Sequence, residues 1–242
     1  MGILRHPIRD APLCRGAVGS VSSLCLAALC IVGPGWVAYA ADDFAASYEA
    51  HKRNLQAGSD ALKKGDLQQA IAAYTKVIEK SPFEATAYLN RGIALFKSKK
   101  FKDAEEDFGK ALILDPRLTN ALAYRGLCRE KSGNEKGALE DYTRAIQQQP
   151  DDVSLQNNIA WLYATAKDAA VRDNVKALVH ASRAAALSKE KNATVLDTLA
   201  RAYFVNGKAK EAAETEKKAL ELEPKNEDFK KTFESYEGAT TK

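Results

Sequence analysis

Residues 85–118 read ATAYLNRGIALFKSKKFKDAEEDFGKALILDPRL, and apolar side chains recur in them with the period of an α-helix. A first apolar stretch includes Tyr88 and Phe96, and a second includes Phe108 and Leu112. Polar residues separate the two stretches, and a proline follows the second, where it stops a helix because it lacks a backbone N–H. The segment therefore predicts a helix, a short turn and a second helix.

Residues that interrupt helices recur at a fixed interval along the chain. Two series are spaced 34 residues apart, namely Pro82, Pro116 and Pro150, and Gly58, Gly92 and Gly126. Pro224 follows 74 residues after Pro150, which is one interval of 34 and one of 40. Such a period is typical of repeat proteins, in which each unit is a helix pair that stacks on its neighbours. The sequence therefore predicts an all-α solenoid of helix-turn-helix repeats.

The period divides most of the chain into predicted repeat units. These units span residues 51–84, 85–118, 119–152, 153–192 and 193–226. The fourth is longer because about five extra residues lie within 167–174, either as a longer loop without function or as a local feature of the repeat. We expect residues 41–50 to lead into the first helix and residues 227–242 to form a capping helix and tail.

The unit resembles the tetratricopeptide repeat, which has an aromatic residue or Leu at position 4, a small residue at 8, Ala at 20, an aromatic residue at 24, Ala at 27 and Pro at 32. The second and third units match throughout, with Tyr88, Gly92, Ala104, Phe108, Ala111 and Pro116, and with Leu122, Gly126, Ala138, Tyr142, Ala145 and Pro150. Departures occur in the end units, as at Asn54 and Val77 in the first and Glu216 in the last. The resemblance implies a right-handed superhelix.

Charged residues recur in phase within the second and third units. Arg91 and Arg125 occupy repeat position 7, and Asp107 and Asp141 occupy position 23. The first and last units have neither partner. We therefore predict a charge pair between the two helices of each middle unit, with a structural rather than a binding role.

The resemblance also implies that the first helix of each unit lines a concave groove through repeat positions 2, 5, 6, 9, 12 and 13. The candidate partner-binding residues at these positions are Asn90, Ile93, Phe96, Lys97, Tyr124, Leu127, Lys131, Asn158, Trp161, Arg201 and Phe204. Rings supply contact area and amides pair with peptide backbone, so the set favours a peptide or protein segment as ligand. In the alternative interpretation, Phe96, Trp161 and Phe204 only pack between neighbouring helices.

Residues 1–40 differ in composition from the rest of the chain. Three arginines precede an uncharged run, residues 16–41, which contains Ala38 and Ala40 near its end. A basic start, a short apolar middle and small residues at these two places are typical of a secretory signal peptide cleaved after Ala40. The alternative is an uncleaved anchor helix, which Pro34 disfavours. We therefore expect an exported protein, periplasmic or secreted.

Cleavage after residue 40 changes the charge and the cysteine count. The full chain has 36 Lys and Arg against 32 Asp and Glu, and the remainder has 33 against 31, a balance that does not favour binding of nucleic acid. Cys128 is then the single cysteine, so an internal disulfide is excluded and a buried core thiol is expected.

Residue patterns typical of enzymes are missing from the sequence. His51 and His180 are the histidines beyond the leader, and no short-spaced group of Cys and His could bind zinc. No glycine-rich phosphate loop or nucleophile motif is present. We predict no catalytic residue, no cofactor and no metal site.

Two functions follow from the sequence. The first is an interaction module or scaffold, without enzymatic activity, that binds a peptide or protein segment in its concave groove. The second is a structural or oligomerising subunit of a cell-envelope assembly, which stacks through its terminal repeats and the tail around Phe229, Phe233 and Tyr236. We expect a monomer with a protein or peptide partner, and no membrane span after cleavage.

Overall fold

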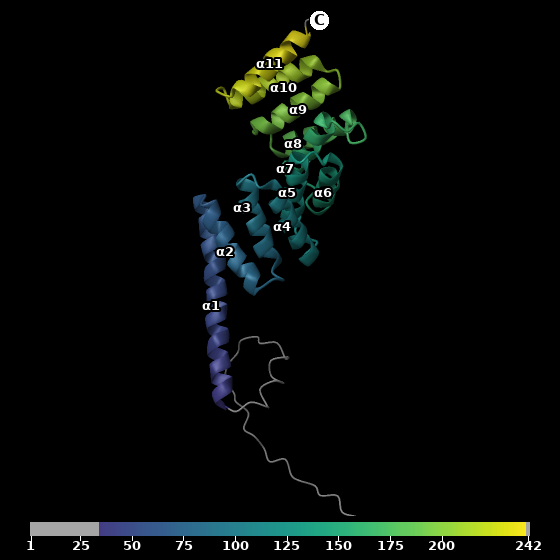
Figure 1. Cartoon of the computed structure of the whole chain (residues 1–242). Coiled ribbons are helices and arrows are strands. Elements are labelled where there is room, and N and C mark those ends of the chain that lie inside the picture. The colour runs from purple at the N-terminus through teal and green to yellow at the C-terminus, as the bar shows by residue number, and fades with distance from the viewer. Residues whose placement is uncertain (1–33, 241–242) are drawn as a thin grey trace, which may run out of the picture. The chain divides into compact units, whose positions relative to one another are not determined.

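A computed structural model describes residues 34–240, with side chains from residue 45 onward, and in this part of the chain all the regular secondary structure is α-helical (Figure 1). The helices are α1 (Pro34–Lys64), α2 (Leu67–Lys80), α3 (Ala85–Lys97), α4 (Phe101–Leu114), α5 (Thr119–Lys131), α6 (Glu135–Gln148), α7 (Val153–Thr165), α8 (Asn174–Leu187), α9 (Ala193–Val205), α10 (Ala209–Leu222) and α11 (Glu227–Thr240). Among the described residues, the compact repeat unit covers 50–240, and residues 34–49 belong to a separate unit.

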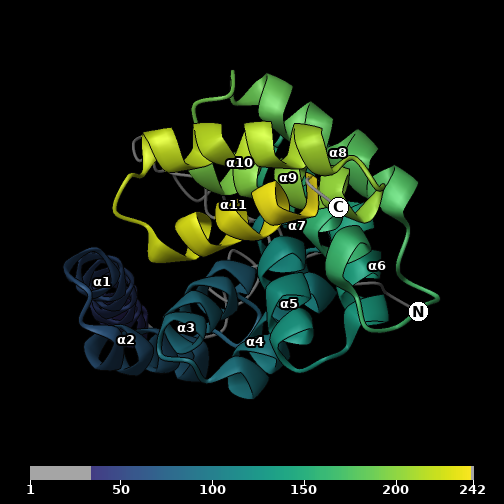
Figure 2. The same cartoon turned by 90° about the horizontal axis from the view of Figure 1, so that it is seen from above.

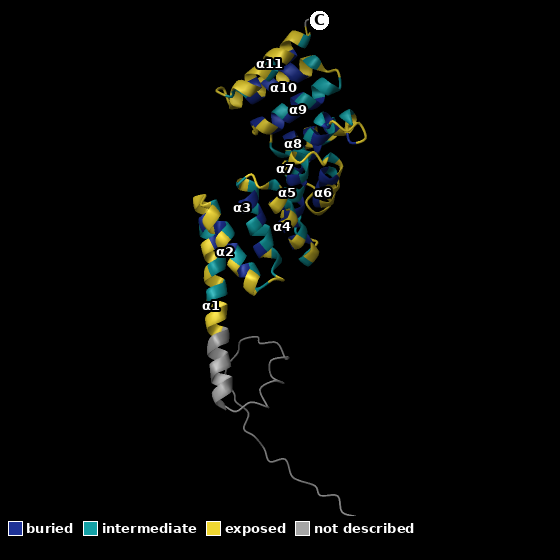
Figure 3. Ribbon diagram, viewed as in Figure 1, coloured by how far each residue is buried: buried dark blue, intermediate teal, exposed yellow. Residues whose placement is uncertain are grey.

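Consecutive helices pack against one another along the repeat unit. From α3 to α10 each odd-numbered helix pairs with the next, and each pair packs on the following one. Residues 85–118 hold α3 and α4 as the helix, turn and helix that their apolar pattern predicts. Buried residues follow this sequence of packed helices in Figure 3. The predicted all-α solenoid is confirmed.

Glycine at repeat position 8 lets an aromatic ring lie between the two helices of a unit. A Cβ on Gly92 would come within 2.7 Å of Phe108, and one on Gly126 within 2.5 Å of Tyr142. Both rings are fully buried. Real Cβ atoms do not approach carbon this closely, so only glycine allows the helices this separation.

The turns between paired helices repeat as closely as the helices do. Gly65, Lys99, Gly133 and Gly207 each have positive φ, between 60° and 81°, and each lies just after the first helix of a unit. This left-handed conformation ends the helix, and it favours glycine because other residues carry a Cβ that crowds the backbone. Three of the four positions are glycine for this reason.

The extra residues of the fourth unit form a loop, residues 166–173, between α7 and α8. The backbone N–H groups of Lys167 and Asp168 donate to the Glu135 carboxylate of α6 at 3.0 and 2.9 Å. Ala166 and Val171 are buried. The loop is therefore anchored to the preceding unit.

The start of the described chain differs from the expected arrangement. Residues 41–50, expected as a lead-in, are already helical, because α1 begins at Pro34. Proline is tolerated in the first turn of a helix, and the alanine-rich segment that follows has high helix propensity. Of the predicted leader, residues 1–33 lie outside the described residues. No helix within residues 34–240 is long and apolar enough to cross a membrane.

The last helix, α11, packs on the fifth unit. It lies along α10, and both views show it beside α9 and α10 (Figures 1 and 2). Phe229 contacts a buried cluster with Ala193 and Leu196 of α9, and Tyr236 joins a second cluster with Ala200. The helix thus covers the apolar face that a further repeat would otherwise bury.

Candidate functional site

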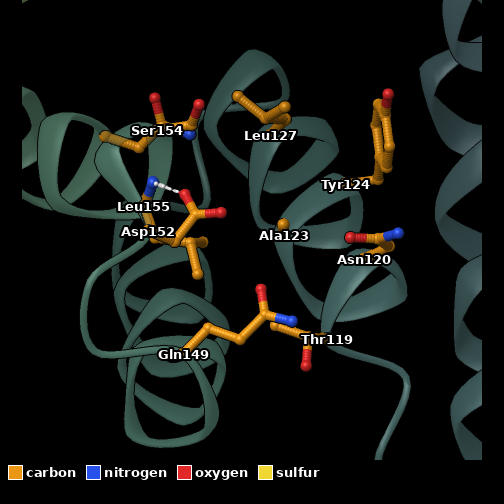
Figure 4. A pocket seen from close by; sticks show the side chains of 10 residues that line it. Thr119, Asn120, Ala123, Tyr124, Leu127, Gln149, Asp152, Ser154 and Leu155 are labelled. Atoms are coloured by element: carbon orange, nitrogen blue, oxygen red, sulfur yellow. Dashed lines mark hydrogen bonds between the residues drawn. The ribbon is translucent and has the colours of Figure 1, made fainter. Parts of the chain in front are cut away.

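A cavity of about 320 Å³ opens between α5 and α7, the first helices of the third and fourth units (Figure 4). The lining residues are Thr119, Asn120, Ala123, Tyr124, Leu127, Gln149, Asp152, Ser154, Leu155 and Asn158. The α5 residues recur at intervals of three and four positions, as Thr119 with Ala123 and Asn120 with Tyr124 and Leu127, so they share one face of that helix. Figure 4 shows Tyr124, Asn120 and Leu127 on the α5 side, with Ser154 and Asp152 across the cavity at the start of α7.

The cavity brings together a minority of the residues that the sequence nominated. Tyr124, Leu127 and Asn158 line it. Outside this lining lie Asn90, Ile93, Phe96 and Lys97 on α3, Lys131 at the end of α5, Trp161 on α7, and Arg201 and Phe204 on α9. The candidate set is therefore divided among several places along the solenoid.

Sequence reasoning missed other residues of the cavity. Asn120 and Ser154 both occupy repeat position 2, and Ala123 occupies position 5. The same periodic rule that nominated Asn158 also points to these three residues. Small and short polar side chains supply little contact area, although they leave the space that makes the cavity.

The cavity wall is polar but nearly uncharged. Its only charged side chain among the described lining residues is Asp152, whose Oδ1 accepts the Leu155 backbone N–H at 2.8 Å and caps α7. Lys97 and Lys131 are exposed in the last turns of α3 and α5. The remaining polar groups are amides and hydroxyls, which both donate and accept hydrogen bonds.

Aromatic residues on the α3 side of the cavity pack mainly against one another. The Tyr124 ring stacks on Phe108 with centroids 5.5 Å apart, and Phe96 meets the edge of Tyr124 at 5.5 Å. Phe96 also contacts Phe101 at 5.4 Å. Phe96 is half-buried and packs between neighbouring helices, and its binding role stays a prediction. Tyr124 both packs in this way and lines the cavity.

The predicted charge pairs are confirmed in the two middle units. Arg91 donates from Nε and Nη2 to the two Asp107 oxygens at 2.7 Å each, and Arg125 donates to Asp141 at 2.8 and 2.6 Å. Arg129 adds a bond of 2.9 Å to Asp141. The bonds to the carboxylates raise the pKa of Arg91 and Arg125. The pairs join helices within a unit and lie outside the cavity lining.

Arg201 and Phe204 are occupied by the protein's own last helix. The Phe204 ring stacks on Tyr236 of α11 with centroids 4.6 Å apart, and the Arg201 guanidinium lies 5.8 Å from the same ring's centroid. Tyr236 itself is only 2% exposed. In this arrangement α11 contacts the part of the predicted groove that these two residues were expected to offer to a partner.

Cys128 and His180 lie among side chains that pack the fold. Cys128 is fully buried, and burial raises the pKa of its thiol to about 12, so it stays protonated. The His180 Nδ1 lies 2.6 Å from Gln156 Oε1, and burial lowers the pKa of this histidine. Within residues 34–240, His, Cys, Asp and Glu nowhere form a group of three suited to a metal.

Comparison with known proteins identifies related sequences. Two family models, both described as tetratricopeptide repeat, match residues 55–119 and 117–212. RNA polymerase II-associated protein 3 of Xenopus laevis is 27% identical over 179 residues, which cover 70% of this chain and 27% of that protein. Mitochondrial import receptor subunit TOM70 of Homo sapiens is 37% identical over 91 residues, which cover 36% of this chain and 15% of that protein. The chain thus matches only a minor part of each relative.

Solved structures with similar folds cover more of the chain. MamA protein aligns with a TM-score of 0.62 and 23% identity, over 74% of this chain and 95% of that one. A repeat protein from Parabacteroides merdae aligns with a TM-score of 0.67 and 16% identity, over 80% of this chain and 74% of that one. At these identities the similarity concerns the fold alone.

Proposed function

This chain belongs to the tetratricopeptide repeat family, and from that membership we propose that it is an interaction module that binds an extended segment of another protein between α5 and α7. The observation that carries the proposal is the cavity between these helices, whose two walls each present an asparagine, Asn120 and Asn158. An extended peptide has unpaired N–H and C=O groups along its length. An asparagine amide can satisfy one of each, so two amides on opposite walls can hold a backbone that runs between them.

The chemistry of the cavity favours an uncharged segment. Ala123 and Leu127 supply apolar surface, and Tyr124 supplies a ring with a polar tip. The carboxylate of Asp152 is engaged in capping α7. Since no cation lines the cavity, an acidic tail would lose its hydration there without gaining an ion pair. Small or apolar side chains on the bound segment fit these walls best.

Replacement of both asparagines tests this function. We expect Asn120→Ala with Asn158→Ala to weaken binding at least tenfold, because each lost bidentate amide pairing contributes about 1 kcal/mol. The probe is a set of 12-residue peptides selected from a random display library on the wild-type chain, with affinity measured by titration calorimetry. Both sites are part-exposed or exposed, so the double variant should stay folded.

The matched control removes an exposed amide from the outer surface. Gln147→Ala on α6 should leave peptide affinity unchanged. A correctly folded double variant that binds the selected peptides as tightly as wild type contradicts the proposal. If the selected peptides are strongly acidic and bind the wild type and the double variant equally well, the binding site lies outside this cavity.

We also propose that the protein is exported with removal of residues 1–40. The support lies in the composition of that segment, which has a basic start and Ala38 and Ala40 at the cleavage site. Sequencing of the N-terminus of the protein recovered from the expressing cell should begin at Ala41. Replacement of Ala38 and Ala40 by bulky residues should block this processing. An N-terminus at Met1 in the wild type contradicts cleavage and favours the anchor alternative.

End-to-end stacking through the last repeat is the second function that the sequence allows. It needs the surface around Phe229 and Tyr236, which is already buried against α9 and α10. No observation favours it over the interaction module.

A further inference from the structure

Glu216 is buried without a hydrogen-bond partner in the last repeat. It lies on α10 at repeat position 24, where the first three units have Tyr74, Phe108 and Tyr142. Its exposed fraction is 0%, and neither carboxylate oxygen accepts a hydrogen bond from a donor in the described part of the chain. Buried carboxylates are ordinarily paired with a cation or with several N–H donors, so this residue needs another source of stability.

Ionisable groups from the two neighbouring helices interact with Glu216. Asp197 and Arg201 come from α9, and Tyr236 comes from α11. Besides burial, the neighbouring Asp197 carboxyl raises the pKa of Glu216, because two carboxyl groups that lie close together in a buried place are more stable when one of them holds a proton.

Arg201 does not supply the missing ion pair. Its guanidinium lies against the Tyr236 ring, and its Nε is buried without an acceptor. The Tyr236 hydroxyl is likewise buried without a partner. Burial, reinforced by the charge of Asp197, raises the pKa of Glu216 to about 8. Glu216 is therefore neutralised by a bound proton rather than by a salt bridge.

Helix α11 contributes to the dry environment of this cluster. Tyr236 of this helix stacks on Phe204 of α9, and Phe233 packs in the same apolar group. Movement of α11 away from α10 would admit water to Glu216 and would further expose Asp197, which is only half-buried. In water Glu216 returns to its ordinary acidity and releases the proton that the pair holds.

We propose that the Glu216–Asp197 pair makes the docking of α11 on the last repeat sensitive to pH, with the helix closed over the protonated pair and released more often as the pair ionises. The device is independent of the groove between α5 and α7. It sets whether the apolar face of α9 and α10 is covered, since Phe229 and Tyr236 leave with α11.

The direction of the pH effect follows from proton linkage. The closed state holds a proton that the open state releases, in the range between the ordinary pKa of glutamate, 4.5, and the raised value of about 8. The stability of the closed state is complete below this range and falls as pH rises through it. The equilibrium constant for opening therefore increases about tenfold per pH unit up to about pH 8 and then becomes constant.

Native-state hydrogen exchange of the whole chain measures this opening. Amides of α11 are followed from pH 6 to pH 9, with correction for intrinsic exchange rates and with α4 amides as an internal reference. We expect the opening constant of α11 to rise steeply up to about pH 8 in the wild type, and to change less than threefold over the same range in Glu216→Gln. The matched control is Glu214→Gln, an exposed glutamate on the same helix, which should behave like the wild type.

Two results would overturn the proposal, namely a wild-type opening constant independent of pH, or an equally steep rise in Glu216→Gln. If that variant does not fold, Asp197→Asn replaces it. Removal of the neighbouring carboxylate makes Glu216 a stronger acid, so the steep range should end at lower pH. An unchanged curve in Asp197→Asn would then overturn the proposal.

Discussion

The third repeat and the last repeat build the same helix pair with opposite treatments of a buried acid. In the third, Asp141 is 1% exposed and both of its oxygens accept bonds from arginines. In the last, Glu216 is completely buried and its oxygens accept none from the described chain. The helix pair therefore depends on small residues where its two helices cross. It tolerates either an ion-paired or an unpaired buried acid next to that crossing.

Position in the array explains why the last repeat departs from the pattern. The third repeat must present regular faces to neighbours on both sides, and its Arg129 also bonds Glu105 of the preceding unit at 2.9 Å. The last repeat has α11 as its following neighbour, a helix that is specific to this chain end. It can therefore replace a ring by an acid, provided that α11 completes the covering.

Removal of the paired acid is expected to have the largest effect. Asp141→Ala leaves Arg125 and Arg129 without their partner at a site where the acid is almost fully buried. We expect a loss of about 3–5 kcal/mol in the free energy of unfolding, measured by urea unfolding followed by circular dichroism.

The corresponding position of the last repeat provides the control. Thr215 donates its hydroxyl to the Glu211 carbonyl of its own helix, so Thr215→Ala should cost less than about 1 kcal/mol. Equal losses in the two variants would show that the ion pair contributes nothing beyond side-chain packing.

A methyl group at repeat position 8 should have an intermediate effect. In Gly126→Ala the new Cβ would lie 2.5 Å from the Tyr142 ring, which is fully buried and cannot move away. We expect a loss of about 1–3 kcal/mol despite the higher helix propensity of alanine. The last repeat already has Ala200 at this position, opposite a helix that carries Glu216 in place of the ring.

Replacement of both Gly126 and Tyr142 separates the effect of crowding from the effect of helix propensity. In the background of Tyr142→Ala, Gly126→Ala should no longer destabilise the protein, and it should add about 0.5–1 kcal/mol through propensity. Melting temperatures of the four proteins measure this coupling. Additive losses would contradict the contact between the glycine and the ring.

Replacement of Glu216, the unpaired acid, should have the smallest effect on the free energy of unfolding. This effect should be a gain rather than a loss. Glu216→Leu keeps the side-chain volume near that of the original residue and removes a carboxyl that is buried without a donor. We expect a gain of about 1 kcal/mol at pH 6 and a larger gain at pH 8, because the raised pKa of Glu216 makes its burial increasingly unfavourable as pH rises. Melting temperatures at both pH values test this, and a loss at pH 8 would contradict it.

Much of the fold could be predicted from residue types at a fixed interval. The ion pairs of Arg91 and Arg125 are an example, because two charges at constant repeat positions must meet whenever the helices cross in the same way. The start of α1 could not be predicted in this way. Its alanine-rich sequence lies before the first repeat unit, so the periodic pattern does not say where the helix begins.

The candidate site was only partly predictable. Periodicity places Asn120, Tyr124 and Asn158 on inner helices, and all three line one cavity. It also places Phe204 on an inner helix, where α11 covers it. The repeat pattern is the same at both places, so it carries no information about which one stays open.

The sequence alone specifies the repeat period, the helix pairs, the glycines that contact the rings and the charge pairs. Each of these depends on residues at a constant separation along the chain. The packing of neighbouring units decided which inner positions form a cavity. The packing of α9, α10 and α11 decided that Glu216 is fully buried and that Arg201 lies on the Tyr236 ring. These properties arise from contacts between helices that no fixed interval relates, so they exist only in the folded chain.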